Sequence, residues 1–307
     1  MFIAQTASQQ KLHEFITGEN DKMKLLSIFV LFFILISQLH SQVITGKVID
    51  FSNGEPLEYV GVGVINTSIG TITDEKGNFK IDVNGQTPKA IVRISMISYK
   101  PQSFTIGELS EKDNTIGLVI APTQLAEVII KPSGKTRQAG TTSYSRIGNW
   151  CGWGGSHNGK GCEIGTKIEL GNSPVLLKNL HIHVQRQAFD SSQYRLHIRT
   201  IANDEPVDEL LSSNIMVTIT KESGWIDIDL SKYNIVLQRD IALTLEWVKV
   251  FGINKNRAMK INNKRVAEYV LFNSKRNQGC TFVRWGTEAK WAKTDNGSPA
   301  FYLTIQE

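Results

Sequence analysis

The sequence is poor in proline and cysteine and has no low-complexity tract. It holds eight prolines and three cysteines in 307 residues. The shortage of proline and of biased segments argues against long disordered regions. Hydrophobic residues make up 41% of the chain, which is enough for packed cores and too little for a protein with many membrane spans. We also find no internal repeat and no amphipathic helix of useful length.

The long hydrophobic run near the N-terminus has the pattern of a secretion signal. Residues 25–36 form a twelve-residue run that is apolar except for Ser27, too short to span a bilayer comfortably. Lys24 precedes the run, and the small residue Ser41 follows it shortly afterwards. A basic start, a short apolar run and a small residue at the exit are typical of a cleaved signal peptide. A buried core helix is the alternative.

We therefore predict a signal peptide over residues 23–41 and a mature chain that begins near Gln42. Residues 1–22 are polar and have no role ahead of the apolar run, so we interpret them as a mis-called upstream segment. No cysteine follows the run, and a lipoprotein-type anchor is not indicated. The mature chain is expected to be exported and to have no transmembrane segment.

Export places the three cysteines where disulfides persist. Cys151 and Cys162 enclose a glycine-rich loop, and a disulfide between them would add about 2–3 kcal/mol on the chain-entropy model. Cys280 would then be left over and buried. A pairing that involves Cys280 stays open, because sequence alone does not fix connectivity.

From Val43 onward, hydrophobic residues recur with a period of two rather than 3.6. Segments 59–65, 79–83 and 91–96 alternate apolar residues with glycine or polar residues. Alternation puts one set of side chains on a core face and the other in water. Asn-Gly and Asp-x-x-Gly turn signals separate the segments. The pattern predicts an all-β chain of short strands arranged in sandwiches.

We expect two β domains, over residues 42–131 and 150–307. The stretch 132–149 is rich in Ser, Thr, Gly and Gln and is predicted to link them. Residues 205–212 are expected to form one helical turn. The candidate strands of the second half are 163–170, 176–187, 194–201, 215–220, 225–230, 241–250, 269–272, 281–285 and 301–305. They suit a jelly-roll-like sandwich.

Three motifs stand in order in the first half: ITGKVID from Ile44, EPLEYV from Glu55 and GTITDEKGNF from Gly70. Through them, this part of the chain resembles the carboxypeptidase-regulatory-like domain. The resemblance implies a seven-stranded transthyretin-like sandwich without peptidase activity. Such domains often form the N-terminal domain of TonB-dependent receptors in Gram-negative bacteria. Only 176 residues follow Lys131, too few for the receptor barrel, so the receptor function is not expected here.

The second half resembles, more loosely, the jelly rolls of carbohydrate-binding domains. Segments 194–199, 209–211 and 224–230 carry this resemblance, which names no ligand. The export signal and the resemblance of the first half together imply a location in the periplasm, at the outer membrane or on the cell surface of a Gram-negative bacterium.

All six tryptophans lie in the second half. Trp225 and Trp247 stand in alternating strands and are expected in the core. Trp150, Trp153 and Trp291 stand in glycine-rich or polar surroundings, and we predict that they form a ligand-binding surface, since exposed aromatic faces can stack on sugars. Simple packing over one end of the sandwich is the alternative.

Three histidines are candidates for a metal site. His181 and His183 share a face of one strand, and His197 lies on a candidate neighbouring strand. Three imidazoles could bind zinc, but alternating strands place polar residues on the solvent face in any case. We therefore predict no metal and no cofactor.

No catalytic residue is predicted. The sequence has no G-x-S-x-G motif, and nothing singles out a pair of opposed carboxylates. The resulting prediction is an exported, non-catalytic binding or scaffold protein of the cell envelope. Its expected partner is a glycan or an envelope protein and not a nucleic acid, with peripheral outer-membrane association as a further option. The alternative is a glycan-acting hydrolase whose second sandwich is catalytic.

Overall fold

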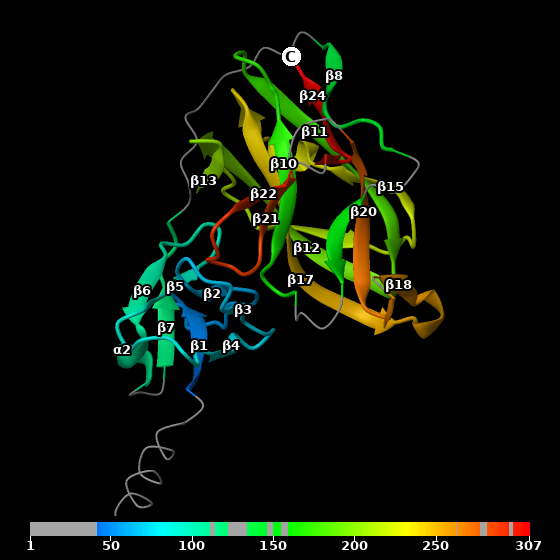
Figure 1. Cartoon of the computed structure of the whole chain (residues 1–307). Helices are drawn as coiled ribbons and strands as arrows, with labels where there is room; N and C mark the ends of the chain where they lie inside the picture. The colour runs from blue at the N-terminus through cyan, green and yellow to red at the C-terminus, as the bar shows by residue number, and fades with distance from the viewer. Residues whose placement is uncertain are drawn as a thin grey trace, which may run out of the picture. The chain divides into compact units, whose positions relative to one another are not determined.

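The computed structural model describes residues 42–110, 114–121, 134–145, 150–154, 159–261, 263–276, 281–294 and 297–307. The predicted signal peptide and Cys280 lie outside these ranges. The described chain is almost entirely β, as the period-two alternation predicted (Figure 1). Within it, no helix has the length and apolar character needed to cross a membrane. Residues 43–307 form one compact unit.

The first module, residues 43–121, is a sandwich of two sheets. Its described strands number seven, as predicted. One sheet has the order β4-β1-β7, with β4 (Asn78–Asp82), β1 (Val43–Asp50) and β7 (Asn114–Leu118). The other has the order β3-β2-β5-β6, with β3 (Gly70–Ile72), β2 (Gly61–Val64), β5 (Ile91–Ser95) and β6 (Gln102–Thr105), followed by the short helix α2 (Ile106–Ser110). Alternate apolar residues such as Phe79 and Ile81 of β4 fill the core between the sheets.

The second module, residues 134–307, is a larger two-sheet sandwich. In its described part, one sheet has seven strands: β13 (Glu205–Glu209), β12 (Phe189–Ala202), β17 (Ile241–Ile253), β10 (Glu163–Ile168), β21 (Thr281–Arg284) and β22 (Ala292–Thr294), with β14 (Ile215–Ile219) also on β12. The other has eight: β23 (Ser298–Pro299), β20 (Tyr269–Lys275), β11 (Val175–Gln187), β24 (Phe301–Gln306), β8 (Thr136–Gly140), β15 (Gly224–Asp229), β16 (Val236–Leu237) and β9 (Trp150–Gly154).

Two segments differ from the sequence prediction. Residues 205–209, expected in a helical turn, form strand β13, which pairs with β12. The segment 132–149, predicted to be a linker, contains strand β8, which pairs with β24 over five residues. Both are edge strands with few apolar residues, and their structure comes from backbone pairing to a neighbour that a local pattern does not reveal.

The core of the second module lies between its two sheets. Leu180, Ile182 and Val184 of β11 face Leu196 and Ile198 of β12 in one apolar cluster. Because side chains alternate along a strand, the residues between these core positions project from the outer faces of the sheets. The two outer faces carry the polar and aromatic groups that could bind a ligand.

The alternation of valine and glycine in β2 has a structural reason. Val62 and Val64 are buried in the core of the first module. Gly63 faces the other way, and a Cβ atom at this position would lie 2.4 Å from Thr287 Oγ1 and 3.1 Å from Glu288 Cβ. Glycine therefore lets the backbone of β2 approach the loop that follows β21.

Candidate functional site

A row of side chains crosses the outer face of the eight-stranded sheet. Trp150 of β9 is opposite Asn273 of β20, and His183 of β11 is opposite Trp225 of β15. His183 Nδ1 lies 2.7 Å from Asn273 Oδ1 and so joins the two pairs. The His183 ring meets the Trp225 ring edge-on at 4.9 Å between centroids. Their neighbours along each strand point into the core, which is why this row faces outward.

A second row lies one step along the same strands. His181 of β11 is opposite Tyr302 of β24 and Asp227 of β15. The His181 and Tyr302 rings are stacked, with centroids 4.1 Å apart and planes at 11°. His181 Nδ1 lies 2.5 Å from Asp227 Oδ1, and its Nε2 lies 2.9 Å from Thr304 Oγ1. These contacts fix the orientation of the His181 ring.

Tyr144 lies over the first row and comes from the segment that precedes β9. Its ring is 4.0 Å from that of His183 and 6.5 Å from that of Trp225, centroid to centroid. The segment is held on the sheet because Ser145 N donates to the Ser274 carbonyl and Lys275 Nζ donates to Ser143 Oγ. We call the whole set the aromatic face, which comprises Tyr144, Trp150, His181, His183, Trp225 and Tyr302.

The aromatic face combines exposed rings with neutral polar groups. Tyr144 and Trp150 are 38% and 40% exposed. Burial lowers the pKa of His183, although its hydrogen bond with Asn273 opposes this effect. Burial and the nearby Asp227 raise the pKa of Tyr302. At neutral pH, His183 is therefore a neutral imidazole and Tyr302 a neutral phenol, and both can stack and form hydrogen bonds.

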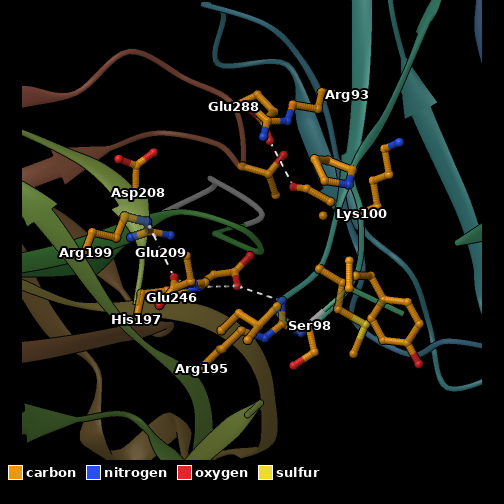
Figure 2. Close-up of a pocket in the computed structure, with 18 of the residues that line it drawn as sticks. Arg93, Ser98, Lys100, Arg195, His197, Arg199, Asp208, Glu209, Glu246 and Glu288 are labelled. Carbon is orange, nitrogen blue, oxygen red and sulfur yellow. Dashed lines mark hydrogen bonds and ion pairs between the residues drawn. The ribbon is translucent and has the colours of Figure 1, made fainter. Parts of the chain in front are cut away.

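The outer face of the seven-stranded sheet carries charged side chains instead. Arg195, His197 and Arg199 occupy alternate positions of β12 and are each less than 8% exposed (Figure 2). Glu246 of β17 is opposite Arg195, and Glu163 of β10 is opposite Glu246 on the other side. We call the following set the charged cluster: Glu163, Arg195, His197, Arg199, Glu209, Glu246 and Arg284.

Each carboxylate of the charged cluster has a cationic partner. Arg199 Nη1 donates to Glu163 Oε2 at 2.6 Å, and Arg284 Nε donates to Glu163 Oε1 at 2.9 Å. Arg195 Nη1 donates to Glu246 Oε2 at 3.1 Å. Burial alone would raise the pKa of Glu163, but Arg199 and Arg284 hold it well below its usual range.

His197 lies between two carboxylates. Its Nδ1 is 2.6 Å from Glu209 Oε2, and its Nε2 is 3.1 Å from Glu246 Oε2. Burial and Arg199 favour the neutral imidazole, yet the carboxylates of Glu163 and Glu209 outweigh them and raise the pKa of His197. Both ring nitrogens then donate, and the ring is a buried imidazolium.

The protonation of this cluster bears on the hydrolase alternative. A glycosidase of the usual kind needs one carboxyl group whose pKa is raised so that it can act as an acid. Burial would raise the pKa of Glu209 and Glu246 too, but His197 and Arg199 lower that of Glu209, and Arg195 and His197 lower that of Glu246. The three glutamates of the cluster are therefore all ionised at neutral pH, and none is suited to donate a proton.

A cavity of about 480 Å³ opens beside the charged cluster. Arg195, His197 and Arg199 line one side of it, and the segment 93–101 of the first module lines the other (Figure 2). Arg195 Nη2 also donates to the Tyr59 carbonyl of the first module. Both modules thus contribute to this cavity.

The three predicted tryptophans do not form one surface. Trp150 belongs to the aromatic face, whereas Trp153, three residues further along β9, points into the core and is only 3% exposed. It packs against Tyr194 and Trp247 there. Trp291 lies next to the charged cluster, where Arg199 and Arg284 stack over its ring at 5.6 and 5.0 Å. Trp247 is in the core as expected.

The three candidate metal ligands are also separated. His181 and His183 lie on the outer face of the eight-stranded sheet, but His197 lies on the seven-stranded sheet, because β11 and β12 pair with different partners. In the ranges that the structure covers, no group of three or more His, Cys, Asp or Glu residues is placed to hold a metal ion.

The structure contradicts the predicted disulfide between Cys151 and Cys162, and both residues are free cysteines. Cys151 lies on β9 of the eight-stranded sheet, and Cys162 directly precedes β10 of the seven-stranded sheet. Both pack against the apolar core from different sheets. Burial raises the pKa of the Cys151 thiol to about 12, so it is unreactive at neutral pH.

Several site residues were missed in the sequence. Trp225 was expected in the core but lies on the aromatic face, and Tyr144 and Tyr302 were not considered. Period-two alternation shows that Trp225 and Ile226 face opposite ways, but it does not show which of them is inside. The alternation of Arg195, His197 and Arg199 with apolar residues was a usable signal for the charged cluster, since buried strands seldom place three cationic groups in a row.

Comparisons with known proteins identify the first module. Residues 44–130 match the family model of the CarboxypepD_reg-like domain. This part of the chain is therefore similar to CarboxypepD_reg-like domains, in agreement with the motifs in its sequence. A search of curated proteins found no significant match.

Solved structures show only distant similarity. One is the crystal structure of the cysteine protease and lectin-like domains of Cwp84, a surface layer associated protein of Clostridium difficile, with 9% identity and a TM-score of 0.35 over 87% of this chain. Another is Cwp84 after propeptide cleavage, with 10% identity and a TM-score of 0.36 over 81% of this chain. The matches span 58% and 66% of those chains. Similarity at this level carries no conclusion about function.

Proposed function

We propose that this chain is an exported, non-catalytic binding protein of the cell envelope whose aromatic face binds a glycan. The CarboxypepD_reg-like domain is consistent with a binding or scaffold role. Export is supported by the apolar run and its flanks. Mass spectrometry of the exported protein should find an N-terminus near Gln42, and retention of residues 25–36 would contradict export by this signal.

The arrangement of the aromatic face carries the proposal. A sugar ring offers apolar C–H groups on its faces and hydroxyl groups around its rim. The C–H faces of the sugar can stack on the rings of Tyr144, Trp150 and Trp225. Its hydroxyl groups can form hydrogen bonds with the polar side chains between these rings. Asp227, whose side chain is 64% exposed, is one such partner. Exposed aromatic side chains that gather on one sheet face also indicate a binding surface.

A glycan array with the full chain tests the proposal. We expect the protein to bind at least one class of glycan. The binding signal should persist after that glycan has been incubated with the protein, because a binding protein leaves the glycan intact. No binding to any glycan would overturn the proposal. Loss of an initial signal with release of new reducing ends would instead favour the hydrolase.

A further inference from the structure

The cavity beside the charged cluster contains cations that the protein itself does not neutralise. Arg93 of β5 and Lys100 line it from the first module. Arg93 is half-buried, and Lys100 lies at the exposed rim. Among the described residues, neither side chain has a hydrogen bond or an ion pair. Partial burial of a guanidinium whose five N–H donors have no acceptor costs desolvation free energy. An acceptor in the space beside it would offset this cost.

The arginines beside the opposite wall already have carboxylate partners. Arg195 binds Glu246, and Arg199 and Arg284 bind Glu163, which is fully buried behind the cavity wall. Glu288, which also lines the cavity, accepts a hydrogen bond from Ser95. These pairs make the wall rigid and leave Arg93 as the half-buried cation without a carboxylate partner, while the half-buried Glu288 carboxylate has no ion pair among the described residues. Asp208 lies exposed at the rim, where water can solvate it.

A second group also lacks a partner. Thr287 lines the cavity, is only 2% exposed, and its Oγ1 has no hydrogen bond in the described structure. Met96, Ile97 and Val207 add apolar surface to the lining. The volume of about 480 Å³ falls in the range of sites for small organic molecules.

We infer that this cavity is a second ligand site, which takes a small organic molecule with one anionic oxygen group, carboxylate or phosphate, bound by Arg93 and Lys100. A guanidinium binds either group through two parallel hydrogen bonds, and an ammonium at the rim adds attraction. The site lies on the opposite sheet from the aromatic face, so it does not depend on the proposed glycan binding.

Isothermal titration of the full chain with three small probes tests the inference. Lactate carries a carboxylate, glycerol 3-phosphate carries a phosphate, and glycerol is neutral. We expect at least one of the two anions to bind with a saturable heat and to raise the melting temperature, and glycerol to do neither. The anion that binds more tightly identifies the group. Absence of binding by both anions, or equal binding of glycerol, would overturn the inference.

Three variants locate the site. Arg93→Gln should weaken binding of the anion by about tenfold or more, because it removes a charge-assisted bidentate contact. Lys100→Gln should weaken it less. Lys80→Gln is the matched control, since Lys80 is an exposed lysine on β4 in the other sheet of the first module, and it should bind as the parent does. Unchanged affinity in Arg93→Gln would contradict the assignment, and melting temperatures without ligand show whether each variant is folded.

Discussion

At the scale of single residues, the charged cluster is held by many buried contacts. Glu163 is fully buried and accepts hydrogen bonds from Arg199, Arg284 and Thr244. A buried carboxylate of this kind does not add much net stability, because desolvation offsets the attraction. Its removal is costly nevertheless, because the partner cations remain buried without compensation.

Glu163→Gln should therefore lower the free energy of unfolding by about 3–5 kcal/mol. Urea unfolding measures this change. The matched control is Glu169→Gln, because Glu169 is a glutamate whose side chain is 79% exposed and whose contact with Lys167 is at the surface. That control should change the free energy by about 0.5 kcal/mol or less. Equal effects in the two variants would show that the cluster is not buried in solution.

The contribution of His197 should depend on pH. Its pKa is raised in the folded state, so its ionic contacts stabilise the protein fully below the unfolded pKa of about 6.5 and are lost as the pH rises through the folded value. Glu209 and Glu246 have lowered pKa values, so their contribution is present above about pH 4.3 and is lost as the pH falls through the folded values.

Urea unfolding of the parent and of His197→Gln between pH 3 and pH 9 tests the direction in which the stabilisation by His197 changes with pH. The difference in unfolding free energy between the two proteins should be largest near pH 5 to 6, about midway between the two unfolded pKa values, and should shrink at alkaline pH. A difference that does not vary with pH would mean that His197 has the same pKa in the folded and unfolded protein, which would contradict the raised value.

At the scale of elements, strand β9 shows how one short strand serves both faces of a sheet. Trp153 fills the core beside Tyr194 and Phe272, and Trp150 is exposed on the aromatic face. Trp153→Ala should lower the free energy of unfolding by about 3–5 kcal/mol through the cavity that it leaves. Trp150→Ala should cost about 1 kcal/mol or less and should weaken glycan binding. Thermal unfolding and titration separate the two effects, and the reverse pattern would show that β9 is paired in the other register.

Strand β2 permits a second test. Gly63→Ala places a methyl group against Thr287 and Glu288, and overpacking of this kind costs about 1–3 kcal/mol. Gly107→Ala is the control, because a Cβ atom there has its first neighbour, the Pro88 carbonyl oxygen, at 3.4 Å. Urea unfolding should show a loss of stability for the first variant and little change for the second. No loss for Gly63→Ala would contradict the close approach of β2 to this loop.

Much of this element structure could be predicted from the sequence, because alternation marks strands directly. The nine candidate strands of the second half all overlap observed strands, from β10 to β24. Edge strands β8 and β13 were missed, as were short strands such as β9, β16, β22 and β23. The stability of such strands comes from pairing with distant strands rather than from their own pattern. Which strands share a sheet was not predictable either, and this is why His197 was wrongly placed beside His181.

The sites were harder to predict than the strands. Trp153 and Trp225 were assigned to the wrong sides of the sheet, since a one-residue change of register exchanges the two faces. Glu163 and Glu246 looked like ordinary strand residues, because their arginine partners lie 36 and 51 positions away. Contacts between residues so far apart depend on the sheet order, which a single sequence does not show.

At the scale of the whole molecule, the two candidate sites lie on different sheets and differ in chemistry. The aromatic face has open rings with polar groups between them, whereas the cavity beside the charged cluster has a half-buried cation. A glycan and a small organic anion could therefore bind independently. This separation means that a failure of one proposal leaves the other open to test.

The most direct test of glycan binding is a titration of three proteins with the strongest glycan found on the array. These are the parent, Trp225→Ala, and Trp285→Ala as the matched control, because Trp285 is an exposed tryptophan directly after β21 in the other sheet. We predict that Trp225→Ala weakens binding by about thirtyfold, the loss of roughly 2 kcal/mol expected for a central aromatic contact. Trp285→Ala should bind like the parent. Equal affinity of the parent and Trp225→Ala would contradict the assignment of glycan binding to the aromatic face.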